Sequence, residues 1–217
     1  QRLRRFFLPR QPREEVNTVD GARDNIRRHY DLSNDLFALF LDESMTYSSA
    51  LFEPGDDLAG GQARKVDAVL DAACVREGSR VLEIGSGWGA LALRAAERGA
   101  NVTTITLSRE QHELARQRVA AAGVDDRVEV LLRDYREVEG SYDAVVSVEM
   151  IEAVGEEYWP SYFGTIDRLL APGGRAAVQA ILMADDRLAT TRNTYTWVQK
   201  YIFPGGLLPS VESVDRA

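Results

Sequence analysis

The chain has 217 residues and a formal charge of −8, and 45% of its residues are hydrophobic and 28% charged. These values are typical of a globular protein and exclude collagen-like, low-complexity and largely disordered chains. No apolar run is long enough for a membrane-spanning helix. The negative charge argues against nucleic-acid binding. The single cysteine, Cys74, excludes an internal disulfide, and we expect it in the core of a protein from a reducing, cytoplasmic compartment.

The N-terminal segment differs in charge from the rest of the chain. Residues 1–13 contain five arginines and no acidic residue, and large apolar side chains stand between the arginines. This mixture favours contact with an anionic membrane surface, where each nearby arginine contributes about 1 kcal/mol. The alternative is a frayed terminus or a helix packed on the domain.

The remaining elements follow from hydrophobic periodicity and breakers. The pattern predicts two short helices within residues 22–42 and a loop at residues 42–61. Helices are predicted at residues 62–74, 91–98, 109–122, 158–170 and 190–201, and strands at residues 80–84, 101–107, 127–132, 143–148 and 175–181. A turn is expected at residues 172–174. Strands that alternate with helices predict an α/β fold with a doubly wound, mostly parallel sheet and an N-terminal helical cap.

A glycine-rich turn follows the first predicted strand. It reads Glu83-Ile-Gly85-Ser86-Gly87-Trp88-Gly89 and opens a helix, so close backbone approach to a ligand is possible. A dinucleotide site would have G-x-G-x-x-G and an acidic residue after the second strand. Here the second strand ends in Thr106-Leu107-Ser108, which disfavours a nicotinamide cofactor.

The pattern E-x-G-x-G-x-G instead resembles the S-adenosylmethionine loop of class I methyltransferases, whose fold is Rossmann-like. Asp134, at the end of the third strand, agrees, because an acidic residue there commonly contacts adenine in that class. The alternative for Asp134 is a cap at a strand end.

Five longer stretches point to a narrower family. They are residues 29–35, 45–49, 106–111, 134–135 and 201–209, which read HYDLSND, MTYSS, TLSREQ, DY and YIFPGGLLP. Together they resemble the cyclopropane-fatty-acyl-phospholipid synthase family, from about residue 22 to the end of the chain. Glu152-Ala-Val-Gly155, Gln179 and residues 193–197 resemble most closely the subgroup that makes tuberculostearic acid precursors.

The resemblance implies S-adenosylmethionine as cofactor and assigns residues to it. Tyr47 and Ser48 would contact its methionine end, and Thr106 and Gln111 its ribose. The full set of expected cofactor residues is Tyr47, Ser48, Glu83, Gly85, Ser86, Gly87, Trp88, Gly89, Thr106, Leu107, Gln111, Asp134, Tyr135 and Arg136. No metal site is expected.

The implied reaction is methyl transfer to the cis double bond of an oleoyl-type chain in a membrane phospholipid. The transfer leaves a carbocation, and a base then removes a proton. We favour a 10-methylene product, which a reductase could later reduce. The alternatives are a cyclopropane product, a small-molecule O- or N-methyltransferase, and a cofactor-binding domain without activity.

The residues expected to act in catalysis are Glu149, Glu152, Ser49, Gln179, Ile181 and Tyr195. Cyclopropane synthases resemble one another in a bicarbonate pocket, but Ser49 here replaces its Cys, Ala153 its first His and Gln179 its second. Bicarbonate is therefore in doubt. Glu149 and Glu152 could share one face of a helical turn, or Glu149 could be structural. Tyr195, with Trp197 and Tyr201, could line an acyl tunnel or simply pack on the sheet.

The expected organisation has three parts. Residues 1–61 form a basic arm and cap, residues 62–185 the cofactor-binding core, and residues 186–217 an acyl-site helix and loop that begin a truncated C-terminal part. Class I members usually have two more strands, so we expect them to be missing here. The implied partners are a phospholipid bilayer, the reductase and a second copy in a homo-oligomer. The location expected is cytoplasmic, peripheral on the inner face of the bacterial membrane.

Overall fold

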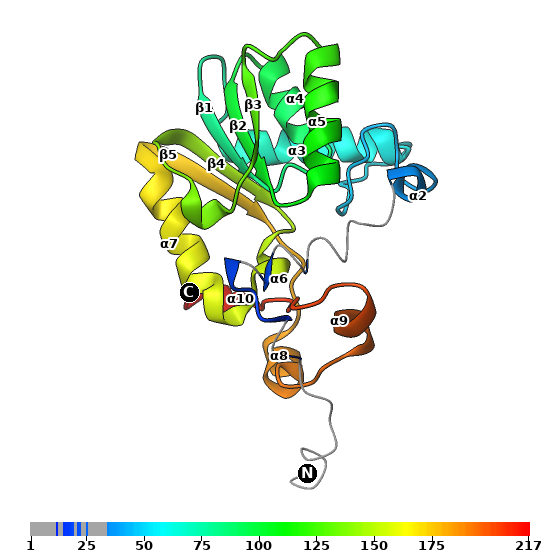
Figure 1. The fold of residues 1–217 in the computed structure, drawn as a ribbon, viewed down its shortest axis with the longest axis vertical. Coiled ribbons are helices and arrows are strands. Elements are labelled where there is room, and N and C mark those ends of the chain that lie inside the picture. Colours follow the sequence, from blue (N-terminus) through cyan, green and yellow to red (C-terminus); the bar gives the residue numbers. More distant parts are fainter. Residues whose placement is uncertain (1–11, 13–14, 20, 23–24, 26–33) are drawn as a thin grey trace, which may run out of the picture.

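The centre of the molecule is a five-stranded parallel sheet with the strand order β3-β2-β1-β4-β5 (Figure 1). The structure is a computed structural model, and it describes residues 12, 15–19, 21–22, 25 and 34–217. The strands are β1 (Arg80–Ile84), β2 (Asn101–Thr106), β3 (Val128–Leu132), β4 (Tyr142–Val148) and β5 (Leu170–Gln179). The predicted fold class, a doubly wound parallel α/β sheet, is confirmed.

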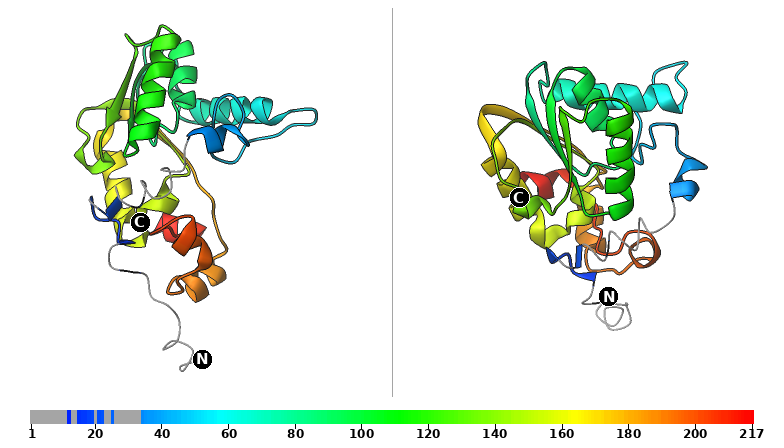
Figure 2. Two further views of the ribbon diagram at one scale, coloured as in Figure 1. Left: turned by 45° about the vertical axis from the view of Figure 1, so that its right-hand side comes forward. Right: turned by 45° about the horizontal axis from the view of Figure 1, so that its top comes forward.

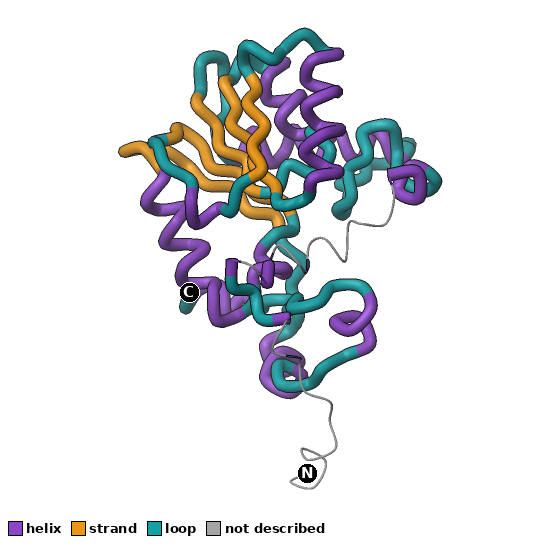
Figure 3. The backbone as a smooth tube through the Cα atoms, viewed as in Figure 1, coloured by secondary structure: helices purple, strands orange, loops and turns teal. Residues whose placement is uncertain are grey.

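Helices cover both faces of this sheet (Figure 3). They are α2 (Asn34–Ala38), α3 (Leu58–Ala72), α4 (Ala90–Glu97), α5 (Arg109–Ala121), α6 (Ile151–Val154), α7 (Trp159–Leu169), α8 (Asp185–Thr191), α9 (Trp197–Tyr201) and α10 (Val211–Asp215). Two 3-10 turns, η3 (Tyr135–Glu137) and η4 (Glu156–Tyr158), complete the described elements. Beyond the end of β5, α8 and α9 form the lower part of the molecule in both views of Figure 2.

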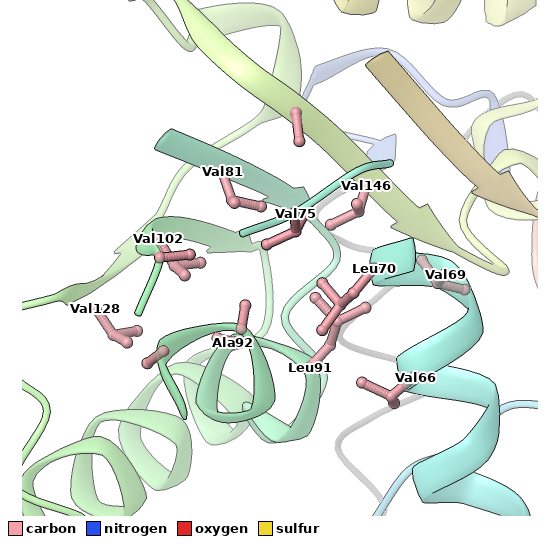
Figure 4. Packing of buried hydrophobic residues seen from close by; sticks show 14 of the residues in the cluster. Val66, Val69, Leu70, Val75, Val81, Leu91, Ala92, Val102, Val128 and Val146 are labelled. Carbon is pink, nitrogen blue, oxygen red and sulfur yellow. The ribbon is translucent and has the colours of Figure 1, made fainter. Parts of the chain in front are cut away.

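The core is divided into two layers because side chains alternate along each buried strand. Val81 and Val146 face α3, α4 and α5, where Leu70 and Leu91 meet them (Figure 4). The adjacent Leu82, on the opposite face of β1, packs with α7 residues and with Leu188 of α8. Burial on both faces explains why β1, after the exposed Arg80, reads as an apolar run broken only by Glu83.

Several predicted boundaries are wrong for local reasons. The carboxylate of Asp57 accepts from the Gly60 N–H, so α3 begins at Leu58 and not at residue 62. The predicted turn at 172–174 is an irregularity inside β5, where the pairing shifts between Leu170 and Arg175. The single helix predicted at 190–201 is two helices, because Thr196 and Gln199 form a capping box that starts α9.

Two further expectations have different outcomes. Cys74 is exposed, in a turn after α3 where its φ is +55°, so its placement in the core was wrong. The basic arm lies almost wholly outside the described residues, as do most of the predicted helical residues 22–33. Across the described residues, no helix combines the length and apolarity that a bilayer crossing requires.

Candidate cofactor and catalytic site

A cavity opens at the carboxyl ends of β1, β2 and β4, where ligands bind in sheets of this type. Twelve of the residues singled out from the sequence line it: Tyr47, Ser48, Glu83, Gly85, Ser86, Gly87, Trp88, Thr106, Leu107, Gln111, Tyr135 and Glu149. They come from the cap loop, from three strand ends and from the turn after β4. The fold thus brings distant parts of the sequence to one place.

The glycine turn after β1 lines part of the cavity. Gly85 has a φ of +97°, and a Cβ at this position would lie 2.5 Å from the Met150 side chain. The amides of Gly85 and Ser86 both donate to the carbonyl of Ile105, at 3.0 and 2.9 Å. Only glycine therefore fits at 85, because any side chain would meet both a strained backbone and Met150.

A polar pair stands at the end of β2. The Thr106 hydroxyl donates to Gln111 Oε1 at 2.8 Å, and the Ser108 side chain caps α5 by accepting from the Gln111 N–H. These bonds fix the Gln111 side chain while its amide nitrogen makes no hydrogen bond to the described residues. That nitrogen is a donor available to a ligand in the cavity.

The cap loop is held over the cavity from two sides. Gln62 of α3 donates to the carbonyls of Thr46 and Ser48, at 3.2 and 2.8 Å. Arg118 of α5 donates to the carbonyls of Glu43, Ser44 and Trp88, at 3.1, 2.8 and 3.1 Å. The loop is therefore positioned by side chains of the core and not by its own sequence alone.

Glu83 and Lys65 are buried titratable residues in the cavity wall, each 4% exposed. Burial raises the pKa of Glu83 to about 8, against the lowering effect of a 2.6 Å hydrogen bond from Thr104. Burial lowers the pKa of Lys65 to about 8, against the negative charges of Glu149, Glu83 and Asp42.

Three predicted cofactor residues lie outside the lining of the cavity. Asp134 forms an ion pair with Arg136 at 2.7 Å, and Arg136 also donates to the carbonyl of Asn17. Gly89 is the N-cap of α4, with a φ of +91°, and its Cα faces Ala115. Asp134 and Arg136 therefore form an ion pair with each other outside the cavity lining, on either side of the lining residue Tyr135 in the sequence.

Glu149 lies at the centre of the predicted catalytic residues. Its Oε1 accepts from the Ser49 N–H, the Ser49 hydroxyl and Gln179 Nε2, at 2.8, 2.6 and 2.9 Å. Its backbone is held at a φ of +50°, which is unusual for a non-glycine residue and is a form of strain found at functional sites. Burial, and next the charge of Glu149, raise the pKa of Tyr47.

Glu152 has different surroundings. Its Oε1 accepts from the Ile181 N–H, and its backbone carbonyl accepts from the Leu207 N–H at 2.8 Å. Its Oε2 is buried and has no partner in the described part of the chain. Burial raises the pKa of Glu152, as does the charge of Glu149, while the Ile181 bond opposes the rise. The two carboxylates do not share a helical turn, because Glu149 precedes α6.

Tyr195 lies apart from these carboxylates. Its hydroxyl donates to Glu15 Oε1 at 2.9 Å. Asn17, beside Glu15 in sequence, donates to the Gly205 carbonyl at 3.0 Å. The structure thus places Tyr195 in a buried polar network that joins the N-terminal segment to the loop after α9. Trp197 and Tyr201 are 66% and 58% exposed, so they do not pack on the sheet.

Sequence reasoning missed part of the lining. The missed residues include Met45, Thr46, Lys65, Arg133, Val148 and Met150. Met45 has a φ of +54°, which no local pattern signals. Lys65 is one of two lysines in the chain, and its position on α3, before the first strand, gave no sign of a site.

Comparison with known proteins agrees with this geometry. The model of one protein family, mycolic acid cyclopropane synthetase, matches residues 18–217. Tuberculostearic acid methyltransferase UfaA1 of Mycobacterium tuberculosis is 60% identical over 203 residues, which cover 90% of this chain and 48% of that protein. Cyclopropane-fatty-acyl-phospholipid synthase of Escherichia coli is 39% identical over 192 residues, 88% of this chain and 48% of that protein.

A solved structure is also similar. Mycolic acid cyclopropane synthase CmaA1, in complex with SAH and CTAB, superposes with a TM-score of 0.82 at 31% identity, over 95% of this chain and 73% of that one. The chain spans about half the length of the curated relatives it matches. From the matched family, the shared fold and the motifs that line the cavity, the chain belongs to the mycolic acid cyclopropane synthetase family.

Proposed function

We propose that the chain binds S-adenosylmethionine in the cavity and directs its methyl group to the cis double bond of an oleoyl-type chain in a membrane phospholipid. The product is a 10-methylene chain, a precursor of tuberculostearic acid. The observation that carries the proposal is the Glu149–Ser49–Gln179 cluster at the cofactor cavity, in a chain 60% identical to a tuberculostearic acid methyltransferase.

The residues around the cavity fit S-adenosylmethionine. At Gly87 the space where a Cβ would lie is open, and the Gln111 amide nitrogen, which makes no hydrogen bond to the described residues, is a donor beside Thr106 for ribose hydroxyls. Tyr135 and Leu107 provide apolar surface for a base. The bound cofactor supplies an electrophilic methyl group on a sulfonium.

The chain's own residues must then manage a carbocation and a proton. The Glu149 carboxylate is held by three hydrogen bonds at the cavity, where its charge stabilises positive charge on the acyl chain. Glu152 has a buried oxygen without a partner among the described residues, and its pKa is raised, so it is suited to accept the proton. We therefore assign electrostatic stabilisation to Glu149 and the base to Glu152.

Bicarbonate has no evident place in this arrangement. The donors that would hold it are Ser49 and Gln179, and both are bonded to Glu149 instead. A carboxylate of the chain thus occupies these donors. We expect turnover in bicarbonate-free buffer to equal turnover with added bicarbonate.

Cyclopropane formation is the second candidate, and the 39% identity with a cyclopropane-fatty-acyl-phospholipid synthase favours it. It shares the cofactor, the alkene and the first carbocation. The 10-methylene product requires a hydride shift from C10 to C9 before a proton leaves the new methyl group, whereas the cyclopropane forms when that methyl group loses its proton and closes the ring onto C9. The exposed Ile181, Leu182 and Trp197 support a lipid acceptor over a water-soluble one for both candidates.

Methyl transfer with labelled S-adenosylmethionine and dioleoyl phosphatidylglycerol vesicles tests the proposal. We expect label in the acyl chains, and none with distearoyl vesicles, which lack the double bond. Label transferred to small water-soluble acceptors in place of lipid would contradict it. We further propose that the basic arm contacts the cytoplasmic face of the bilayer. We also propose that the chain forms a homo-oligomer, and that a reductase acts on the methylene product.

A further inference from the structure

Lys65 is a buried cation with spare hydrogen-bonding capacity in the cofactor cavity. It is 4% exposed and lies on α3, and its ammonium donates one hydrogen bond, to Ser48 Oγ at 2.6 Å. Within the described residues it forms no ion pair. An ammonium has three donors, and two of them make no hydrogen bond to the described residues, so they are open to a ligand.

This arrangement is costly without a ligand. A buried charge is normally paired, because an unpaired one loses its hydration without compensation. Glu83, Glu149 and Asp42 favour the charged form of Lys65 through longer-range charge interactions, yet burial still lowers its pKa to about 8. An anion that entered the cavity would supply the missing partner.

The neighbouring Ser48 adds a second donor. Because its oxygen accepts the hydrogen from Lys65, its own hydroxyl hydrogen is free to donate. An ammonium and a hydroxyl side by side match the two oxygens of a carboxylate.

We propose that Lys65, together with the Ser48 hydroxyl, binds the carboxylate of the amino-acid part of S-adenosylmethionine. The inference rests on the proposed function, since it assumes the same cofactor in the same cavity. It assigns to Lys65 a binding role that is separate from the proton transfer assigned to Glu152.

Calorimetric titration with two ligands tests this assignment. S-adenosylhomocysteine carries the carboxylate, and 5′-methylthioadenosine lacks the amino-acid part. For Lys65→Met we expect affinity for S-adenosylhomocysteine to fall roughly 10- to 100-fold, the range for loss of a charged hydrogen bond. Affinity for methylthioadenosine should change less than about twofold. Lys65→Arg should restore part of the loss, and Lys200→Met, at the other lysine, should change neither affinity.

A second measurement does not depend on the Met variant folding. The wild-type protein should prefer S-adenosylhomocysteine over its carboxamide at pH 7 and lose much of that preference at pH 9.5, where Lys65 is neutral. Lys65→Arg should keep the preference, because guanidinium stays charged. The groups facing Lys65 are Ser48, Glu83, Glu149 and Asp42, and all are unchanged in this variant.

The opposing outcomes are distinct. Equal losses for both ligands, or an unchanged affinity of Lys65→Met for S-adenosylhomocysteine, overturn the assignment. A preference for carboxylate over carboxamide that does not depend on pH overturns it too, as does a Lys65 effect that arises only when bicarbonate is added. A wild-type protein that binds neither nucleoside overturns the proposed function as well.

Discussion

We expect two glutamates three residues apart, Glu149 and Glu152, to have different roles because their surroundings differ. Glu149 is held by Ser49 and Gln179, whereas Glu152 keeps a buried oxygen without a partner in the described structure. For Glu152→Gln we expect turnover to fall about 10²- to 10⁴-fold, the usual contribution of a positioned base. Cofactor affinity should stay within about twofold.

The measurement is methyl transfer at saturating cofactor, with calorimetry for affinity. Glu156→Gln is the matched control, since Glu156 forms an ion pair with Arg192 away from the cavity lining. A fully active Glu152→Gln protein would remove Glu152 from the mechanism.

The raised pKa of Glu83 leads us to expect that the stability of the fold depends on pH. Its folded pKa of about 8 lies above the ordinary value of 4.5. Between these values the folded state retains a proton that the unfolded state has lost. The free energy of unfolding therefore falls as pH rises from 5 to 8, by up to about 1.4 kcal/mol per pH unit from this group. We expect Glu83→Gln to abolish that component.

Urea unfolding without cofactor at several pH values measures this effect. Glu129→Gln, at an exposed glutamate of β3, is the control and should leave the slope unchanged. Identical pH profiles for wild type and Glu83→Gln would show that Glu83 does not titrate in this window.

At the residue scale, motifs predicted much of the cavity but not its charge. The glycine turn, Tyr47, Thr106 and Gln111 all line it. Lys65 was missed because a lone lysine on an amphipathic helix is usually solvated, and only the packing of α3 beneath the cap loop buries it. Tyr195 instead bonds Glu15, a long-range contact that no local pattern encodes.

At the element scale, the cap loop depends on α5 for its position. Arg118 binds three backbone carbonyls, two of them in the loop and one in the glycine turn. For Arg118→Met we expect affinity for S-adenosylhomocysteine to fall roughly tenfold, because the loop that carries Tyr47 and Ser48 loses its anchor. Calorimetry measures the change.

Arg116→Met is the matched control, because Arg116 is exposed on the same helix. If both variants bind the cofactor as wild type does, the loop is positioned without Arg118 and the account of its anchoring is wrong.

Element boundaries were predictable where burial alone decides them. Strands β1 to β4 lie within a residue or so of their predicted ranges. The apolar runs of β1, β2 and β4 are largely buried, and in β3 buried valines alternate with the exposed Glu129. The extension of β5 through residues 171–174 was not predictable, since a Pro-Gly-Gly sequence is typical of a turn. The capping box at Thr196 could have been found, and would have divided the predicted C-terminal helix.

At the scale of the whole molecule, charge is separated between the arm and the rest of the chain. Residues 1–13 hold five arginines in a protein with a formal charge of −8. We expect removal of this arm to weaken binding to anionic vesicles and to flatten its dependence on salt. Vesicle sedimentation at several salt concentrations measures both.

Neutral phosphatidylcholine vesicles are the control, and the arm should matter little there. Unchanged binding of the truncated protein to anionic vesicles would make the arm irrelevant to membrane contact and leave the exposed apolar residues near Trp197 as the contacting surface.

The fate of the carbocation after methyl transfer, a hydride shift or ring closure, decides the product. The most direct test incubates the protein with S-adenosylmethionine and dioleoyl phospholipid vesicles, and analyses the acyl chains before and after mild hydrogenation. Methylene and cyclopropane products have equal mass, so hydrogenation must separate them. We predict a product that takes up hydrogen and becomes a methyl-branched chain. A product that resists hydrogenation would be a cyclopropane and would contradict the account.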